Sequence, residues 1–271
     1  MSRIRTSLLV AGGTLYFMMR RDRKRLERLA AASLETLLNA IDANDSQTGG
    51  HVRRVAQYSL ILADACGVDG RGRAGVERVA LFHDIGKIQE ALFDITHDDE
   101  SLSPEERRMI ATHPARGAEV LAPLSFFYPD LGEGVIAHHE RWDGSGYPRQ
   151  LRGEEIPLAA RIVAIADTFD AITHQRRYGI ARSVDEAADV IRAERGKQFD
   201  PDILDIFLSP AVFDRVRRCY RSGAASHSRP RTPQRNTAGR KTGPSAGPSA
   251  PDIPFRWRST PHDAAAPVQS S

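Results

Sequence analysis

The sequence predicts an all-α fold, and three observations support this. Helix-start signals recur at residues 103–106 (SPEE), at residues 183–186 (SVDE) and at Asp200-Pro201, where a capping side chain precedes the first turn. Residues 156–173 are too long and too alanine-rich for a strand and begin with an isoleucine-proline pair, so we expect a buried helix there. A half-buried strand shows alternating apolar and polar residues, and nowhere in the chain do the two alternate cleanly over six positions.

The N-terminal region contains an apolar segment followed by a helical pattern. Residues 7–19 (SLLVAGGTLYFMM) are apolar but number only thirteen, fewer than the roughly 17–25 that span a bilayer. Basic residues flank the segment and no signal-peptidase site follows it. It could be a short membrane-associating anchor, the remnant of a longer membrane segment, or a helix packed on the body. Residues 22–43 repeat leucine and alanine at helical spacing, so we expect a connector helix there, and we assign residues 1–40 to the apolar segment and this connector.

Charge and composition separate a tail from the folded body. The whole chain carries a net charge of +3, but residues 221–271 alone carry +6, which leaves about −3 for the rest. This tail is rich in serine, glycine, proline and arginine, so we expect it to be disordered. The basic balance therefore gives no indication of nucleic-acid binding by the body. Two cysteines, Cys66 and Cys219, cannot build a disulfide framework and indicate a reducing compartment, so we expect a cytoplasmic protein, either free or associated with the inner face of the membrane.

Histidines and aspartates lie on, or at the ends of, several predicted helices. His51 shares a helix face with Val55 and Tyr58, so its ring should point inward. Asp167 lies on the apolar face of the 156–173 helix, where an ionised carboxylate is costly without a cation. A single inward histidine is usually a hydrogen-bonded core residue, but a set of this size indicates a polynuclear metal site. The candidate ligands are His51, His83, Asp84, His113, His138, His139 and Asp167.

The local placement of these ligands follows from the predicted helix ends. His83 and Asp84 end an apolar helix, and we expect His113 to close the helix that begins at residue 103. His138 and His139 should end another helix, directly before a glycine-rich turn.

Three motifs resemble the HD-GYP family of the HD metal-dependent phosphohydrolase superfamily. They are HDIGK at residues 83–87, His113, and HHERWDGSGYP at residues 138–148, which completes the pattern HHExxDGxGYP. The likeness covers about residues 41–208. It implies an HD-type helical bundle, which we place at residues 41–220, and a cyclic di-GMP phosphodiesterase activity.

The resemblance also implies how the ligands divide between two metal ions. His51, His83, Asp84 and Asp167 would hold one ion, and Asp84 would bridge to a second ion held by His113, His138 and His139. Two dications, two carboxylates and a bridging hydroxide leave about +1 to attract a phosphodiester, and the hydroxide would be the nucleophile. Imidazole-rich shells suit transition metals, and the family favours iron or manganese.

Other motif positions imply contacts with the substrate, a cyclic dinucleotide. Lys87 follows Asp84 by three residues and would act with it in catalysis, although a surface lysine is an alternative. Arg176 matches the arginine that grips a substrate phosphate in the family, but could also face solvent. Three departures weaken the likeness. Residues 88–106 (IQEALFDITHDDESLSPEE) replace a loop that contains proline and lysine in many family members, and they bring acidic residues near the presumed cleft. Gln47 stands where the family often carries an acid that holds a third metal, so we expect two metals, and Gly179 replaces a commonly basic residue.

The glycine-rich turn supplies the last candidates. We expect Gly144 and Gly146 to adopt backbone angles closed to other residues. Tyr147 could pack against a guanine or against the turn itself. His97 and His174 fall outside the matched positions, and we expect neither to be a ligand.

Three functions are compatible with these patterns. The first is a phosphodiesterase that opens cyclic di-GMP to linear pGpG or GMP. The second is the same chemistry on another nucleotide, such as cyclic GMP-AMP or a nucleoside phosphate, which the departures from the family pattern favour. The third is a signalling module that binds metal or nucleotide without turnover. A homodimer is compatible with all three.

Overall fold

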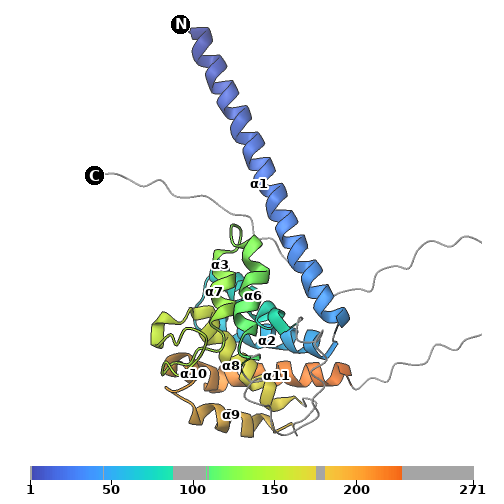
Figure 1. Ribbon diagram of the computed structural model, residues 1–271, viewed down its shortest axis with the longest axis vertical. Coiled ribbons are helices and arrows are strands. Elements are labelled where there is room, and N and C mark those ends of the chain that lie inside the picture. The colour runs from blue at the N-terminus through green and yellow to red at the C-terminus, as the bar shows by residue number, and fades with distance from the viewer. Residues whose placement is uncertain (1, 45, 88–107, 109, 175–180, 228–271) are drawn as a thin grey trace, which may run out of the picture. The chain divides into compact units, whose positions relative to one another are not determined.

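The computed structural model describes residues 2–44, 46–87, 108, 110–174 and 181–227, which form helices joined by short turns (Figure 1). No strand occurs in these ranges, where the only bridge is an isolated pair between Arg195 and Phe199, so the all-α prediction is confirmed. The elements, in chain order, are α1 Ser2–Asn44, α2 Ser46–Ala65, α3 Gly70–Phe82, η1 Ile85–Lys87, α6 His113–Leu121, η2 Ala122–Leu124, α7 Pro129–Ile136, η3 Gly153–Glu155, α8 Leu158–Thr173, α9 Val184–Ala193, α10 Pro201–Leu208 and α11 Pro210–His227.

Helix α1 is continuous and packs on the body along one stripe. Ala30, Leu34, Leu38 and Ile41 are buried at intervals of three and four residues, the spacing of one helix face. The helix therefore packs on the body from Ala30 to Ile41. A search of the described part of the chain finds no helix with both the length and the apolarity that crossing a membrane requires.

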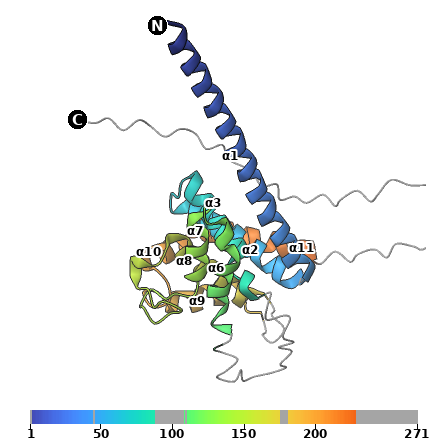
Figure 2. The same cartoon turned by 45° about the horizontal axis from the view of Figure 1, so that its top comes forward.

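Helix α8 is central to the core. Figure 2 shows it among α2, α3 and α9, and these helices contact it. Its Phe169 is fully buried and meets Tyr58 of α2 edge to face, with ring centroids 5.1 Å apart, and Phe207 of α10, with centroids 5.7 Å apart. Burial of side chains this large stabilises the fold by about 1.5–3 kcal/mol each. This packing fixes α2 against α8, and both helices carry candidate ligands.

The predicted helix starts are largely confirmed. Ser183 caps α9 and forms a capping box with Glu186, and Asp200 caps α10 through the amide groups of its first turn. The buried helix predicted over residues 156–173 begins at Leu158. The start signal at residues 103–106 lies outside the described residues. Helix α11 continues to His227, and residues 228–271, most of the predicted tail, lie outside the described part.

Candidate metal centre

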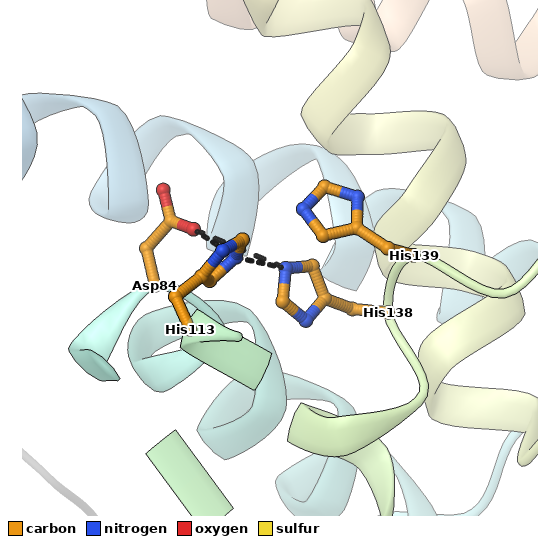
Figure 3. A group of neighbouring side chains, drawn as sticks. All are labelled: Asp84, His113, His138 and His139. Atoms are coloured by element: carbon orange, nitrogen blue, oxygen red, sulfur yellow. Dashed lines mark hydrogen bonds and ion pairs between the residues drawn. The ribbon is translucent and has the colours of Figure 1, made fainter. Parts of the chain in front are cut away.

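All seven candidate ligands come together in the structure, in two adjoining groups. One group consists of His51, His83 and Asp167, and the other of Asp84, His113, His138 and His139, the latter drawn in Figure 3. Within each group the potential ligand atoms lie within 4.8 Å of one another. The groups adjoin where Asp84 Oδ2 lies 3.6 Å from His83 Nε2.

The elements bring these side chains together from distant parts of the chain. His51 projects from α2 and Asp167 from α8, and their facing atoms, Nε2 and Oδ1, are 3.2 Å apart. His83 is the C-cap of α3, so Asp84 follows directly in the turn that leads into η1. His138 and His139 follow the end of α7.

The prediction that His113 closes a helix is wrong. His113 is the first residue of α6, and Pro114 lies in the first turn of this helix. Proline needs no hydrogen-bond acceptor for a backbone N–H and suits the first turn of a helix, so Pro114 marks a start here rather than a stop. The ring still enters the site: His113 Nε2 lies 3.3 Å from Asp84 Oδ1.

Three of the imidazoles are fixed in one tautomer by the backbone. The Nδ1 atoms of His83, His113 and His138 lie 2.8, 2.6 and 2.6 Å from the carbonyl oxygen three residues earlier. A carbonyl only accepts hydrogen bonds, so each Nδ1 carries the proton and donates it. Each Nε2 is left with its lone pair directed into the cluster, which is the form that binds a metal.

Several potential ligand atoms in the cluster have neighbouring polar atoms but no hydrogen bond of acceptable geometry. His51 Nε2, His83 Nε2 and Asp84 Oδ1 are buried and make no hydrogen bond. His113 Nε2 and His138 Nε2 are 3.2 Å apart, so with both protons on Nδ1 two lone pairs face each other. A bound cation would turn these unfavourable contacts into ligand bonds. The residues therefore fit a metal, and the imidazole-rich set favours a transition ion over Mg²⁺ or Ca²⁺.

The protonation states also suit metal binding. Burial lowers the pKa of His83 and of His138, and burial together with the nearby His113 lowers the pKa of His139 to about 4. Burial alone would raise the pKa of Asp84, but the positive charge of Lys87 and the interactions with His83 and His113 outweigh it and hold this pKa well below its usual value. At neutral pH the rings of His83, His138 and His139 are therefore neutral and the Asp84 carboxylate is ionised, the forms that act as ligands. His51 differs: burial would lower its pKa, but hydrogen bonds with Asp167 and Asp170 and the charges of these carboxylates outweigh burial and raise it to about 9, so His51 must release a proton when a metal binds.

Lys87 reaches the same site, where we expected it. Its Nζ donates a hydrogen bond to Asp84 Oδ2 at 2.8 Å, and about a third of the side chain is exposed. Tyr147 stacks on the ring of His139, with centroids 5.0 Å apart and the planes tilted by 26°. Arg176 and Gly179, like His97, lie outside the described residues, as does the side chain of Gln47.

The glycine-rich turn confirms one glycine prediction and corrects the other. Gly144 has a φ of +80°, a conformation that favours glycine. Gly146 has no such angle. A Cβ atom there would lie 2.3 Å from the backbone nitrogen of Arg141 and 2.6 Å from Glu140 Cα. Gly146 is therefore required because two stretches of backbone pass too close together for a side chain.

Sequence reasoning missed two buried carboxylates that support the site. Glu140, within the motif, accepts hydrogen bonds from the backbone N–H groups of Arg149 at 2.7 Å and Leu151 at 3.1 Å, so it braces the turn. Asp170 contacts His51 from the side opposite the cluster, with Oδ2 2.7 Å from Nδ1. One signal was available for Asp170, because it follows Asp167 by three residues and so shares its helix face. His174 Nδ1 also lies near this carboxylate, 3.0 Å from Asp170 Oδ1.

Comparison with known proteins gives a consistent picture. Residues 35–203, more than half of the chain, match the HD domain family. The 3'3'-cGAMP-specific phosphodiesterase 2 of Vibrio cholerae is 34% identical over 174 residues, which cover 64% of this chain and 33% of that protein. The cyclic di-GMP phosphodiesterase response regulator RpfG of Xanthomonas campestris is 36% identical over 190 residues, which cover 69% of this chain and 48% of that protein.

A solved structure shares the fold. It is the HD domain of the L. monocytogenes phosphodiesterase PgpH in complex with cyclic-di-AMP, with a TM-score of 0.51 and 20% identity, covering 73% of this chain and all of that one. The chain spans between about a third and a half of the length of the two curated relatives described above.

Proposed function

Since this chain belongs to the HD domain family, and within it to the HD-GYP branch, we propose that it is a metal-dependent phosphodiesterase that opens cyclic di-GMP. The observation that carries the proposal is the convergence of seven potential ligands in two adjoining groups. A module that had lost its chemistry would be expected to have lost ligands, and this one retains a full set.

We propose that the cluster holds two transition ions, iron or manganese, with Asp84 shared between them. The geometry supports sharing, because Asp84 Oδ1 faces His113 at 3.3 Å while Oδ2 lies 3.6 Å from His83. Bound ions of this kind lower the pKa of a coordinated water toward neutrality and offset the negative charge of a phosphodiester. Hydrolysis of cyclic di-GMP adds one water across one P–O bond and yields linear pGpG, and the bound ions would supply the activation of that water.

The chain's own residues supply orientation and charge at this centre. Lys87 holds Asp84 by a charged hydrogen bond, and its partly exposed ammonium group can also pair with a phosphate oxygen. Tyr147, stacked on His139, fixes the plane of that imidazole. We assign Arg176 to a substrate phosphate on the family resemblance alone.

A second cyclic dinucleotide deserves equal testing. Relatives that align with this chain include phosphodiesterases of Vibrio cholerae named as specific for 3'3'-cGAMP, at 34% and 36% identity. The two substrates differ only in one purine base, and the ligand cluster acts on the phosphate. The bases are therefore read by residues outside the cluster, and 3'3'-cGAMP is our alternative substrate.

Turnover by anaerobically purified protein, loaded with Mn²⁺ or Fe²⁺, tests the proposal. We expect cyclic di-GMP to be converted to pGpG or GMP, as resolved by liquid chromatography, and 3'3'-cGAMP runs in parallel. Asp84→Asn should abolish turnover, whereas Asp64→Asn, which loosens a surface ion pair with Arg73, should retain it. Intact substrates after incubation with fully metallated protein would reject the assignment.

We also propose that the N-terminal part of α1 contacts an anionic membrane surface. Five basic residues lie within positions 21–28 against two acids, and most of their side chains are exposed. Leu26 and Leu29, on the same segment, are 50% and 57% exposed. With the apolar run at 7–19 directly before it, the segment combines apolar and basic surface, which suits a helix lying at an interface. Each basic residue near anionic lipid contributes about 1 kcal/mol.

A further inference from the structure

The buried carboxylate of Asp170 lies directly behind the metal centre and is not one of its candidate ligands. It is 1% exposed and belongs to α8, one turn after Asp167. Its Oδ2 accepts a hydrogen bond from His51 Nδ1 at 2.7 Å. His51 Nε2, on the opposite edge of the ring, lies 3.2 Å from Asp167 Oδ1. The imidazole thus stands between a carboxylate of the metal centre and a carboxylate outside it.

Arg54 holds this outer carboxylate in place. Its Nε donates to Asp170 Oδ1 at 2.8 Å and its Nη2 donates to Oδ2 at 3.0 Å, a two-point contact that fixes the carboxylate plane. Arg54 follows His51 by three residues on α2, so the two side chains lie on the same face of that helix. The pair Asp170–Arg54 therefore ties the ligand-bearing face of α2 to α8.

His51 needs such an acceptor because of where it lies in its helix. His83, His113 and His138 sit beside helix ends, where backbone carbonyls are not used by the helix and can accept from Nδ1. His51 lies inside α2, where the carbonyls are engaged in the helix itself. Its Nδ1 proton can be held only by a group from another element. Asp170 supplies that group, across 119 positions of sequence.

We propose that Asp170 is a positioning residue for His51, fixing its tautomer and ring orientation so that Nε2 faces the metal, and that Arg54 positions Asp170 in turn. The inference rests on the metal-binding part of the proposed function. Asp170 and Arg54 would thus position a ligand of the ion held by His51, His83 and Asp167, and no ligand of the other ion. Loss of Asp170 should therefore weaken metal binding at the His51, His83 and Asp167 group and spare the group that contains His113, His138 and His139.

Metal binding by the full chain tests this without any hydrolysis assay. Wild-type protein and the variants Asp170→Ala, Asp170→Asn and Arg54→Ala are loaded with Mn²⁺ and titrated with a chelator, and bound metal is counted by elemental analysis. For Asp170→Ala we expect the affinity for one ion to be about 10–100-fold lower than in wild type. The affinity for the other ion should be unchanged. Asp170→Asn keeps the shape and one acceptor oxygen, so its loss should be smaller and equally selective. Asp170→Glu should restore part of the binding.

A second readout follows the Nδ1 proton of His51 in the metal-free protein. In ¹⁵N-histidine spectra the Nδ1–H of His51, identified by its absence in His51→Gln, should be protected in wild type and lost in Asp170→Ala. The matched control is Asp205→Asn, which breaks a two-point Arg195–Asp205 pair of the same geometry on the surface, with distances of 2.8 and 2.7 Å. This control should change neither readout.

Two results would overturn the inference. One is unchanged affinity for both ions in Asp170→Ala, and the other is equal weakening of both ions together with a lowered Tm, which indicates general loss of structure. Failure of the proposed catalytic function is a separate result, because it would appear as metallated wild-type protein that leaves cyclic dinucleotides intact.

Discussion

The substitution Gly86→Ala should damage the metal centre through a backbone contact. Gly86 lies in η1, two residues after Asp84, and η1 packs directly on the start of α6. A Cβ atom at Gly86 would lie 2.1 Å from the carbonyl oxygen of His113 and 2.8 Å from the backbone nitrogen of Gly117. Both are backbone atoms, so no side-chain rotation can relieve the overlap. The new methyl group must push apart the two segments that carry Asp84 and His113.

The size of the effect follows from the contact distance. Carbon and oxygen atoms approach to about 3.3 Å at closest, so a contact of 2.1 Å requires the segments to separate by roughly 1 Å. Such overpacking costs about 1–3 kcal/mol of stability. The same shift acts on the Asp84 Oδ1 to His113 Nε2 distance of 3.3 Å. Ligand bonds tolerate only about 0.2 Å, and a misplacement of about 1 Å can lower turnover by roughly 10²-fold.

The assay compares two Gly→Ala variants in bound metal, turnover and Tm. Gly75 lies inside α3, and a Cβ atom there meets nothing within 4 Å, so Gly75→Ala should be stabilising by about 0.5–1 kcal/mol and should keep full activity. Gly86→Ala should lose metal and activity. Wild-type metal content and turnover in Gly86→Ala would refute the reasoning, because they would mean that η1 can move away without disturbing the ligands.

Three further outcomes are expected. Removing metal with a chelator should lower the Tm in thermal denaturation. Re-adding Mn²⁺ at about 100 times its Kd should raise the free energy of unfolding by about 2.7 kcal/mol. An unchanged Tm would speak against a structural contribution of the ions. Glu140→Ala leaves the N–H groups of Arg149 and Leu151 without their acceptor, so it should cost about 1–3 kcal/mol for each and more than Glu140→Gln, as shown by chemical denaturation. Reversing the basic charges within residues 21–28 should abolish co-sedimentation with anionic vesicles, and binding that persists would contradict the membrane proposal.

The ligand set was predictable because helical periodicity and motif spacing act over short stretches of sequence. His51 could be placed on the buried face of its helix from its neighbours Val55 and Tyr58, and the structure has both of these buried. The same reasoning failed at His113, because proline both ends one helix and begins another, and local sequence does not say which helix contains the histidine.

The supporting residues were harder to predict, since their role depends on how distant segments pack. Asp170 is one helical turn from Asp167, but its value lies in contacts with Arg54 and His51, which are 116 and 119 positions away. Those contacts depend on the orientation of α2 relative to α8. The apolar patterns of the two helices do not determine this orientation. Gly146 is a similar case, because its small size is dictated by the backbone of Glu140 and Arg141 folding back over it.

The location of each imidazole relative to its helix determines which group accepts the hydrogen bond from its Nδ1. A histidine at a helix end finds its acceptor in its own segment, so its tautomer is set as soon as that local turn forms. His51, inside a helix, obtains its acceptor only when α2 and α8 have packed. The ring of His51 is therefore positioned only in the folded domain, whereas the rings of His83, His113 and His138 are positioned locally. A metal ion bound at the His51 group adds its binding energy to the α2–α8 contact, and loss of that ion should loosen this contact first.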